Sequence, residues 1–547
     1  MEDSPIPPAN IDSSDSSTWS PLKNRLFTIL LLVNLFTMLA VFMNGLAAAW
    51  VLTDITDSPA VVASLQFALA LPAFLLALFA GALADIVGRK KLILIAQFGS
   101  LAVAGAFALL AALDVQSATA VLGLTAVLGI FTALAAPAWI AIIPGLVPRS
   151  ELAGAMTLSS AGLSGAMAVG PAVAGLVIAV AGPTAVFVLN VVVFTAGTFA
   201  LRVWRPAPQT GLPAEHLGSA IRIGLQYLRY DRPLKVVIGK IIPFAFTVTA
   251  LMALLPAVAR FRLGAGPAMF GLLAGAGGIG AVLALLAMPR IRNKVGPDGV
   301  VLVSMFVQAG VFIVLATTRS LPVAFAVLVA GGAATLAVVS TVMTVLQVVL
   351  PAWVRGRGVA VYLLALQGSF AVGALVWGAV AEQTSLQSAL IAAGVIMGMS
   401  AVLITPLRLG RYVDIDTEMV QLIDNPPAVT SVHDDDGPIL LTVSWVIPLD
   451  QRDDFIVAMQ PVRKALKRQG ALSFHLVEDV ERQGHMIESF TMATWSEYRR
   501  LPQRATMADQ AVHDALVAVV GPDLPGVAVH REIRLNARQN RSTDKDT

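Results

Sequence analysis

Long apolar segments separated by short polar connections fill the first three quarters of the chain. A membrane-spanning helix needs about 20 apolar residues in succession. The pattern predicts twelve such helices, at roughly 26–52, 60–84, 91–113, 118–146, 155–181, 184–203, 234–261, 267–289, 298–318, 321–350, 358–381 and 386–408. Very short connections join several of them, which is typical of tightly packed helical hairpins. We therefore expect an all-α membrane body of twelve transmembrane helices.

Composition separates this body from a second region. The 547 residues are 57% hydrophobic and 13% charged, whereas about 25% of residues are charged in an ordinary soluble protein. Residues 1–409 hold 22 Lys and Arg and 13 Asp and Glu, but residues 410–547 hold 15 and 21. The second region therefore has the charge density of a water-soluble domain. The absence of Cys excludes disulfides, thiol nucleophiles and thiolate metal sites.

These changes in pattern define the expected domain organisation. It comprises a disordered cytoplasmic N-terminus (1–22), a first six-helix half (23–203), a linker with an amphipathic helix (204–233), a second six-helix half (234–409), a further linker (410–437), a soluble α+β domain (438–535) and a disordered tail (536–547). The first segment is rich in Ser, Asp and Pro, a composition that does not support a packed core.

An internal repeat supports the division into two halves. The chain reads LVPRSELAGAMTL from Leu146 and LPAWVRGRGVAVYLL from Leu350, which aligns Ala155 with Ala360. The same offset places Arg89 opposite Lys294 in two other basic connections. Two related six-helix halves are typical of transporters whose solute site lies between the halves at the membrane midplane.

The distribution of Lys and Arg predicts the orientation in the bilayer. Nineteen of these residues lie in or beside the connections on the amino-terminal side, and only Arg260, Arg262 and Arg319 lie on the opposite side. Connections rich in Lys and Arg stay in the cytoplasm. We expect a multi-pass protein of the cell (inner or plasma) membrane with both termini cytoplasmic. The basic character fits this topology better than nucleic-acid binding, so we expect no nucleic-acid partner.

Residues 81–91 read GALADIVGRKK, and they place a charge cluster in a hairpin connection. Gly81 and Asp85 share a helix face, Gly88 turns the chain, and Arg89 and Lys90 supply cations. Such a cluster can stabilise one conformation and release it in another; the alternative is an ordinary basic hairpin whose Asp forms an ion pair. The segment resembles the signature of the major facilitator superfamily in this connection, with Ile86 where many members have Arg. The resemblance implies a conformational latch.

The fifth expected helix contains GPAVAG at residues 170–175. Gly170 and Gly175 allow close helix packing, and Pro171 removes a backbone donor and permits a bend. The segment is similar to the fifth-helix motif of superfamily antiporters, although Ala174 replaces one Gly. The alternative is general small-residue packing.

The wider resemblance covers about residues 20–410. The stretches NGLAAAWVLT (44–53), AAPAWIAIIPGLVPRSELAGAM (135–156), LPAWVRGRGVAVY (350–362) and VWGAVAE (376–382) are similar to the branch that contains the bacterial enterobactin exporter. This resemblance implies efflux of a small molecule of drug or siderophore type, by proton-coupled antiport. Ser164 and Met167 replace Asn and Arg of many relatives.

Uncharged polar residues within the expected helices are candidates for the solute cavity. They are Asn34, Asn44, Gln66, Asn190, Ser340, Thr344, Gln347 and Gln367. Ser340, Thr344 and Gln347 fall on one face of a helix, which either lines the cavity or bonds to a neighbouring helix. Amides and hydroxyls with few charges suit an amphiphilic solute.

Ionisable residues inside a membrane are costly and usually functional. None of the twelve expected helices contains His, and the acids that we identify in or beside them are Asp54, Asp85, Asp114 and Glu382, all near helix ends. Asp54 is the best candidate proton carrier; the alternative is an ordinary loop acid. No residue pattern indicates a metal ion or a cofactor.

The soluble region shows alternating and helical periodicities in turn. Strands are predicted at 439–448, 471–480, 485–495 and 526–535, and helices at 450–469 and 496–519. This β-α-β-β-α-β order is ferredoxin-like. With MATWSEY at 492–498, the region resembles the small antibiotic-biosynthesis-monooxygenase fold. Its histidines, His475, His485, His513 and His530, lack metal-ligand spacing. We expect an interaction or regulatory domain, with self-association through a sheet face.

Together these features predict a secondary transporter rather than an enzyme. Its partners are a small-molecule substrate and the lipid bilayer, and it works by alternating access. The alternatives are a membrane-tethered enzyme or a ligand sensor, in which the soluble domain carries the activity.

Overall fold

The computed structural model describes residues 19–77, 79, 83, 87–204, 222, 226–351, 353–410, 432–520 and 526–531. The chain divides into two compact units. Unit 1 comprises Met1–Leu217, Val236–Val345 and Ala360–Gly410, and unit 2 comprises Gly218–Lys235, Leu346–Val359 and Arg411–Thr547. Each unit is described by itself below.

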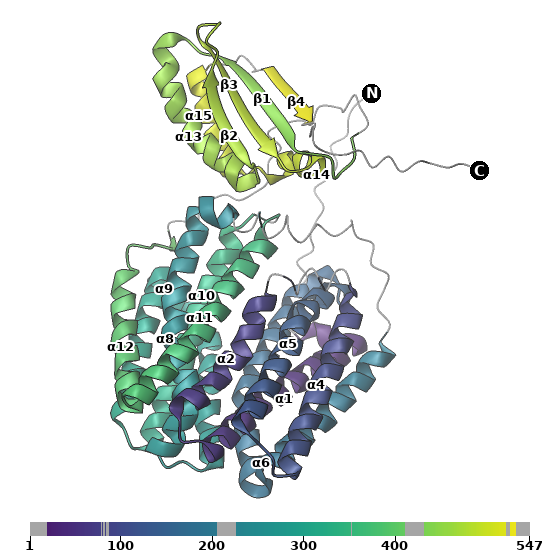
Figure 1. The fold of residues 1–547 in the computed structure, drawn as a ribbon, viewed down its shortest axis with the longest axis vertical. Helices are drawn as coiled ribbons and strands as arrows, with labels where there is room; N and C mark the ends of the chain where they lie inside the picture. Colours follow the sequence, from purple (N-terminus) through teal and green to yellow (C-terminus); the bar gives the residue numbers. More distant parts are fainter. Residues whose placement is uncertain are drawn as a thin grey trace, which may run out of the picture. The chain divides into compact units, whose positions relative to one another are not determined.

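Unit 1 is built from long helices (Figure 1). The first half contains α1 (Arg25–Ile55), α2 (Pro59–Leu76), α4 (Arg89–Ala112), α5 (Ala118–Ile142) and α6 (Leu152–Val203). The second half contains α8 (Arg232–Ala257), α9 (Pro267–Thr317), α10 (Leu321–Val349), α11 (Arg355–Gln383) and α12 (Leu386–Leu403); α8, α10 and α11 each extend into unit 2.

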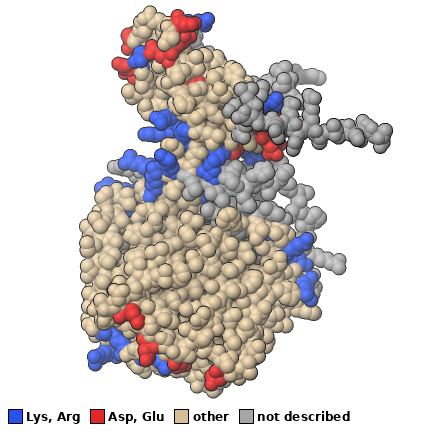
Figure 2. Space-filling model, in the orientation of Figure 1, with Lys and Arg blue, Asp and Glu red and all other residues tan. Residues whose placement is uncertain are grey.

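Eleven helical segments of the described chain are long and apolar enough to cross a membrane. On the face of unit 1 that Figure 2 shows, charged side chains lie near the edges, and a broad area between them carries none. An uncharged band between charged margins is the surface that a bilayer requires, because charged groups are costly in its hydrocarbon core.

Two elements are interrupted by a glycine in a left-handed backbone conformation. Gly182 in α6 has φ 79°, and Gly296 in α9 has φ 67°. Proline follows in both cases, so the chain turns without a separate loop. At 1.5 Å per residue, the 52 residues of α6 would extend about 78 Å as one straight helix, far beyond the roughly 30 Å of a hydrocarbon core. Each element is therefore two helices joined at a glycine.

Polar side chains fix several helix starts. Asn24 accepts hydrogen bonds from the backbone N–H groups of Leu26 and Phe27 at the start of α1, and Ser58 accepts one from Val61 in α2. Such N-caps satisfy donors that have no partner within the helix. Asn24 also donates to the Leu146 carbonyl oxygen at 2.7 Å, so the cap joins α1 to the segment after α5.

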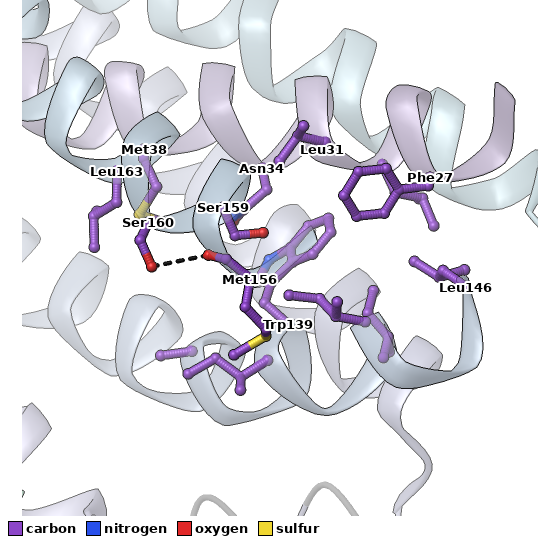
Figure 3. A pocket seen from close by; sticks show the side chains of 15 residues that line it. Phe27, Leu31, Asn34, Met38, Trp139, Leu146, Met156, Ser159, Ser160 and Leu163 are labelled. Atoms are coloured by element: carbon purple, nitrogen blue, oxygen red, sulfur yellow. Dashed lines mark hydrogen bonds between the residues drawn. The ribbon is translucent and has the colours of Figure 1, made fainter. Parts of the chain in front are cut away.

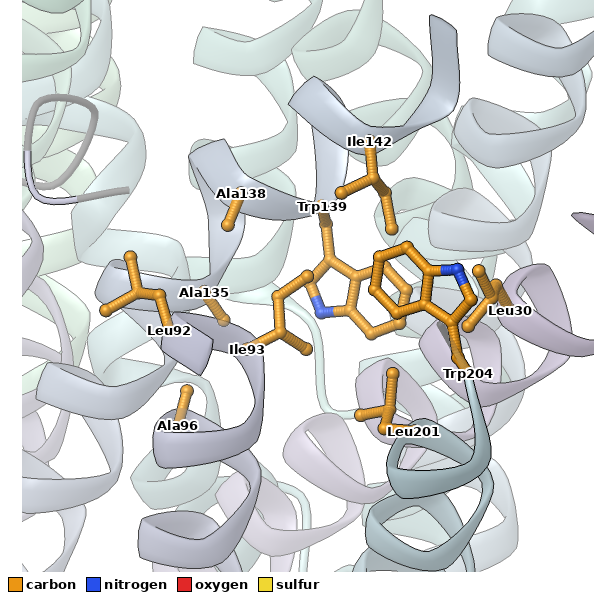
Figure 4. Packing of buried hydrophobic residues seen from close by; sticks show 10 residues of the cluster. All are labelled: Leu30, Leu92, Ile93, Ala96, Ala135, Ala138, Trp139, Ile142, Leu201 and Trp204. Carbon is orange, nitrogen blue, oxygen red and sulfur yellow. The ribbon is translucent and has the colours of Figure 1, made fainter. Parts of the chain in front are cut away.

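A tightly packed cluster joins four helices of the first half (Figure 4). The rings of Trp139 from α5 and Trp204, just after α6, lie among apolar side chains of α1 and α4. The buried members are Leu30, Leu92, Ile93, Ala96, Ala135, Ala138, Trp139, Ile142, Leu201 and Trp204. This cluster therefore holds α1, α4, α5 and α6 together at one end of the first half.

The soluble part of unit 2 is a four-stranded sheet with helices on one face (Figure 1). The strands are β1 (Ile439–Val446), β2 (Ser473–Glu478), β3 (His485–Met492) and β4 (Gly526–Arg531), in the order β2-β3-β1-β4 with every adjacent pair antiparallel. Phe455 and Met459 of α13 (Arg452–Gln469) and Leu516 of α15 (Met507–Val520) pack on Trp445 and Met486 of the sheet.

The helix predicted at 496–519 is wrong as a single element. The chain forms α14 (Trp495–Arg499), a 3-10 turn (Leu501–Arg504) and then α15. Pro502 lies in the turn, where its missing N–H and fixed φ disfavour a continuous helix. Thr506 and Asp509 then cap α15: the Asp509 carboxylate accepts from the Thr506 N–H at 3.0 Å, and the Asp509 N–H donates to Thr506 Oγ1 at 3.3 Å.

Candidate solute pathway and gate

The helices of unit 1 run back and forth between two ends, which we name by a residue at each. The Asp54 end contains the α1–α2, α4–α5 and α11–α12 connections and the residues just after α8. The Lys90 end contains the start of α4, the end of α5 and the Gly296 turn of α9. The two ends make different kinds of contact.

Toward the Asp54 end, backbones of the two halves touch where α6 crosses α9. A Cβ added to Gly175 would lie 2.5 Å from the Pro267 carbonyl oxygen and 2.8 Å from the Gly271 Cα. A Cβ on Gly271 would in turn lie 2.5 Å from the Pro171 carbonyl oxygen. No other residue type fits these positions without displacing backbone, so the glycines set the distance between the halves.

The predicted fifth-helix motif therefore serves two contacts. Gly175 and Pro171 face the second half, whereas Gly170 faces α1, with Phe42 Cβ 2.9 Å from the position of an added Cβ. The crossing continues toward the middle of α9, where a Cβ on Gly275 would lie 2.6 Å from the Ala168 carbonyl oxygen. Small residues at such crossings are the usual means of close packing in membranes.

A second crossing between the halves joins α2 and α11. A Cβ on Gly378 would lie 2.8 Å from Ala63 Cβ and 3.2 Å from Ala60 Cα. Nearer the middle, a Cβ on Gly368 would lie 2.9 Å from the Phe74 ring. The halves are thus held together by two close pairs of helices.

Charged side chains join the halves beside these crossings. Asp54, at the end of α1, forms an ion pair with Arg260 after α8. The Arg260 guanidinium lies 5.0 Å from the centre of the Trp50 ring, and Trp50 stacks on Phe270 with centroids 6.1 Å apart. The predicted proton carrier is therefore paired with a cation of the other half, and both side chains are partly exposed.

Glu382 makes a second polar contact between the halves. Its carboxylate, at the end of α11, accepts hydrogen bonds from Ser58 Oγ at 2.8 Å and from the Ala60 N–H at 3.3 Å. Both donors belong to the start of α2, where the helix dipole favours an anion. We name Asp54, Arg260, Glu382 and Ser58 the polar gate.

At the Lys90 end, the predicted latch residues bind within the first half. Gly88 has φ 90°, which accounts for the glycine at this turn. Arg89 donates to the Ala141 carbonyl oxygen at 2.7 Å, and Lys90 donates to the carbonyl oxygens of Arg202 and Trp204. Gly81 and Asp85 lie outside the described residues, so their part in a latch stays a prediction.

The second half has a charged contact at the corresponding place. Lys240 Nζ lies 2.8 Å from Asp298 Oδ1, and Asp298 also accepts from the N–H groups of Leu409 and Gly410 at 2.8 and 2.9 Å. Leu409 corresponds to Trp204 in the internal repeat, since the two are separated by the same offset as Ala155 and Ala360. In both halves, a charged residue near the start of the third or ninth span therefore binds the backbone after the sixth or twelfth.

Sequence reasoning missed Asp298 as a site residue. Two signals were present: Asp298 follows a Gly-Pro pair at the start of an apolar segment, and Lys240 falls inside another. Because Lys240 is only 3% exposed, its charge needs a partner.

A cavity of about 240 Å³ opens near the Lys90 end of the first half (Figure 3). Asn34 from α1, Trp139 from α5 and Ser159 from α6 point toward one another in it. Its lining residues are Phe27, Leu30, Leu31, Asn34, Met38, Ala136, Trp139, Ile140, Ile142, Ile143, Leu146, Met156, Ser159, Ser160 and Leu163. The lining has no charged side chain, which suits an apolar solute with a few hydrogen-bonding groups.

The other predicted cavity residues lie elsewhere. Asn190 is fully buried without a hydrogen-bond partner for either amide atom, and Nδ2 of the buried Asn44 also lacks one. Gln66 and Gln367 are half-buried. In α10, Ser340 and Thr344 donate to carbonyl oxygens of their own helix, and Thr344 and Gln347 are exposed. Of the predicted set, only Asn34 lines this cavity.

Comparison with solved structures places this arrangement among known transporters. The chain is 13% identical to the nucleoside transporter NupG, with a TM-score of 0.55 over 70% of this chain and 99% of the other. It is 14% identical to a D-xylose–proton symporter, with a TM-score of 0.55 over 71% and 98%. It is 15% identical to a bacterial homologue of the human lysosomal transporter Spinster, solved in an inward-facing, occupied conformation. The TM-score of that comparison is 0.54 over 71% of this chain and 97% of the other. These identities establish the fold alone.

No curated protein matches the chain significantly. The family model described as transmembrane secretion effector matches residues 16–540, nearly the whole length. All of these relatives are transporters, so the reading of the chain as a non-enzyme agrees with them. The chain therefore belongs to the transmembrane secretion effector family of the major facilitator superfamily, and it is a multi-pass transporter of the cell membrane.

Proposed function

We propose that the chain exports small amphiphilic molecules of drug or siderophore type by alternating access. One observation carries this proposal: the two halves meet through bare backbone and polar contacts toward the Asp54 end, whereas the cavity of the first half opens near the Lys90 end. A solute site that opens toward one end while the other is closed is one of the two states that alternating access requires.

The orientation follows from charge and from the number of crossings. Counting α6 and α9 as two spans each gives twelve crossings, which returns the chain to the side on which it began. The basic connections at the Lys90 end support a cytoplasmic location for that end. The described conformation is then open to the cytoplasm and closed to the outside, ready to accept a solute for export.

Proton coupling is assigned to the polar gate. Asp54 and Glu382 hold the halves together more strongly as carboxylates, because a protonated carboxyl loses its ion pair and much of its strength as an acceptor. Protons arriving from outside would weaken both contacts and favour outward opening. The Gly81–Lys90 segment, with Asp85, is proposed as the latch that holds the opposite state.

The soluble region is proposed to be a ferredoxin-like regulatory domain. Its element order β1-α13-β2-β3-α15-β4 and the strand order β2-β3-β1-β4 support this assignment. Self-association through the sheet face opposite the helices is part of the proposal, and it is tested by the oligomeric state of the protein in detergent.

Uptake into inside-out vesicles tests the proposed function. A panel of lipophilic drugs and siderophores is offered with and without an inward-acid proton gradient. We expect gradient-dependent uptake of at least one solute, and loss of uptake when the gradient is collapsed. Uptake in vesicles that lack the protein sets the background. If no solute accumulates above that background, or if accumulation ignores the gradient, export by proton coupling is wrong.

A further inference from the structure

Unit 2 contains more than the soluble domain. It also includes Gly218–Lys235, which leads into α8, and Leu346–Val359, which joins α10 to α11. All three helices that begin or end here, α8, α10 and α11, continue into unit 1. Segments far apart in sequence therefore meet in unit 2, and their contacts bear on what the soluble domain does.

Asp231 links the start of α8 to the soluble domain. Its carboxylate accepts a hydrogen bond from the Leu234 N–H at 2.8 Å, which caps α8. The same carboxylate lies 3.8 Å from Arg468 of α13, and Arg468 also pairs with Asp509 of α15. Asp231 and Asp509 are 3% and 5% exposed. One guanidinium thus provides the positive charge for two buried carboxylates. Without it, each carboxylate would be a buried, unpaired charge that destabilises the fold.

Trp353 provides a second attachment from the α10–α11 connection. Its indole Nε1 donates to the Arg504 carbonyl oxygen at 3.2 Å, and the Arg504 guanidinium lies 5.0 Å from the centre of the ring. Tyr227 approaches the ring edge-on at 5.9 Å. Arg504 is 3% exposed. The aromatic pair therefore joins the segment before α8 to the connection after α10, against the soluble domain.

Two polar contacts extend this surface. Gln226 Nε2 donates to the Ala471 carbonyl oxygen at 2.6 Å, and Arg222 binds both oxygens of Glu497 at 2.8 and 2.9 Å. Bidentate pairs of this kind are specific in geometry as well as strong. A cavity of about 310 Å³ remains between the segments, so they are incompletely packed against each other.

We propose that the soluble domain is a clamp on the second half of the transporter, with Arg222, residues 226–231 and Trp353 of the same chain as its partner. While the clamp is closed, the start of α8 and the α10–α11 connection move as one body with the domain. Separation of the clamp frees α8 from the α10–α11 connection and changes the rate of transport. The clamp stands on the contacts alone, whereas its effect on transport rests on the proposed function.

Cross-linking in the full-length protein tests the clamp. Because the native chain has no Cys, the pair Gln226→Cys and Leu472→Cys reacts uniquely with a short bis-maleimide. We expect efficient cross-linking, detected by mass spectrometry of the joined peptides. Adding Arg468→Gln leaves Asp231 and Asp509 without their cation and is expected to lower the yield at least fivefold. Arg463→Gln, an exposed position on the same helix, is the matched control.

Two further measurements separate release of the clamp from unfolding. Hydrogen exchange in β3 must stay slow in Arg468→Gln, and adding Asp231→Asn and Asp509→Asn is expected to restore cross-linking by removing the unpaired charges. The clamp is overturned by an unchanged yield in Arg468→Gln, or by a yield in the Gln226→Cys, Leu472→Cys pair no higher than in a protein with only one of the two Cys.

The effect on transport is measured in the same variants. Arg468→Gln is expected to change the initial uptake rate at least threefold, with Arg463→Gln at the wild-type rate. Reduced cross-linking with unchanged uptake overturns the regulatory role. Reduced cross-linking in a protein that transports no solute in any variant contradicts the proposed function instead, and leaves the clamp supported.

Discussion

The two ends of unit 1 use their charges differently. At the Asp54 end, Asp54 and Glu382 bind partners in the opposite half and are partly exposed. At the Lys90 end, Lys90 and the Lys240–Asp298 pair bind within their own halves, and Lys240 is buried. The first arrangement can open and close at little cost, whereas the second holds each half rigid. Under the proposed alternating access, contacts between the halves are the ones that open and close, whereas contacts within a half are kept.

The largest expected effect comes from breaking the rigid arrangement. Asp298→Ala leaves Lys240 buried without its anion and removes the acceptor of two backbone N–H groups. We expect a loss of about 3 kcal/mol, the low end for a broken buried pair because Asp298 is about a third exposed. A fall of several degrees in the unfolding midpoint of purified protein measures it, and Asp298→Asn, which keeps one acceptor, is expected to lose less.

This variant also tests the comparison itself. A single Thr53→Cys reporter, 2% exposed beside the polar gate, reacts with a maleimide only when the Asp54 end opens. Asp298→Ala is expected to leave its labelling rate within twofold of the parent. A tenfold change would mean that the Lys90 end is part of the gate.

The second prediction concerns the backbone crossing between the halves. Gly175→Ala places a methyl group 2.5 Å from the Pro267 carbonyl oxygen. Overpacking of this kind costs about 1–3 kcal/mol. Here it destabilises only the closed state of the Asp54 end. We expect faster labelling of the Thr53→Cys reporter and uptake at background. Gly165→Ala is the matched control, since a Cβ there meets nothing within 4 Å; equal behaviour of the two variants would contradict the crossing.

The sequence predicted most of the fold because membrane helices carry their own signal. An apolar stretch of the right length can only be a span, so the segments at 26–52 and 321–350 match α1 and α10 closely. The strand at 439–448 was equally clear, because Leu441 and Trp445 alternate with less buried residues. The helix at 496–519 failed because capping by Thr506 and Asp509 overrides helical periodicity.

The candidate site was predicted less well, for a physical reason. A polar residue in an apolar segment must be satisfied by something, but the sequence does not say whether by a cavity or by a neighbouring helix. Asn34 lines a cavity, whereas Asn190 is buried away from it. Likewise, Asp54 and Glu382 were recognised as acids near helix ends, but their partners Arg260 and Ser58 lie more than 200 residues away.

The third prediction sharpens the description of the polar gate. Asp54→Asn removes an ion pair whose members are 45% and 31% exposed, so we expect less than about 1 kcal/mol, seen as a two- to fivefold faster labelling of the Thr53→Cys reporter. The exchange Asp54→Arg with Arg260→Asp is expected to restore the slow rate. Asp57→Asn, an exposed acid of the same connection, is the control. A rate in the exchange variant as fast as in Asp54→Asn would show that the pair does not hold the gate.

The smallest effect is expected at Glu382, where the substitution removes the charge of the side chain and keeps its size. Glu382→Gln keeps one oxygen that can accept from Ser58 and the Ala60 N–H, so only the charge is lost. Hydrogen bonds to charged groups are stronger than neutral ones by about 1 kcal/mol. The dipole at the start of α2 favours the anion by a further fraction of a kcal/mol. We expect labelling of the Thr53→Cys reporter up to threefold faster than in the parent. Glu382→Leu, which removes both acceptors, should label faster than Glu382→Gln. Equal labelling rates in Glu382→Gln and Glu382→Leu would show that an acceptor oxygen at this position does not hold the gate.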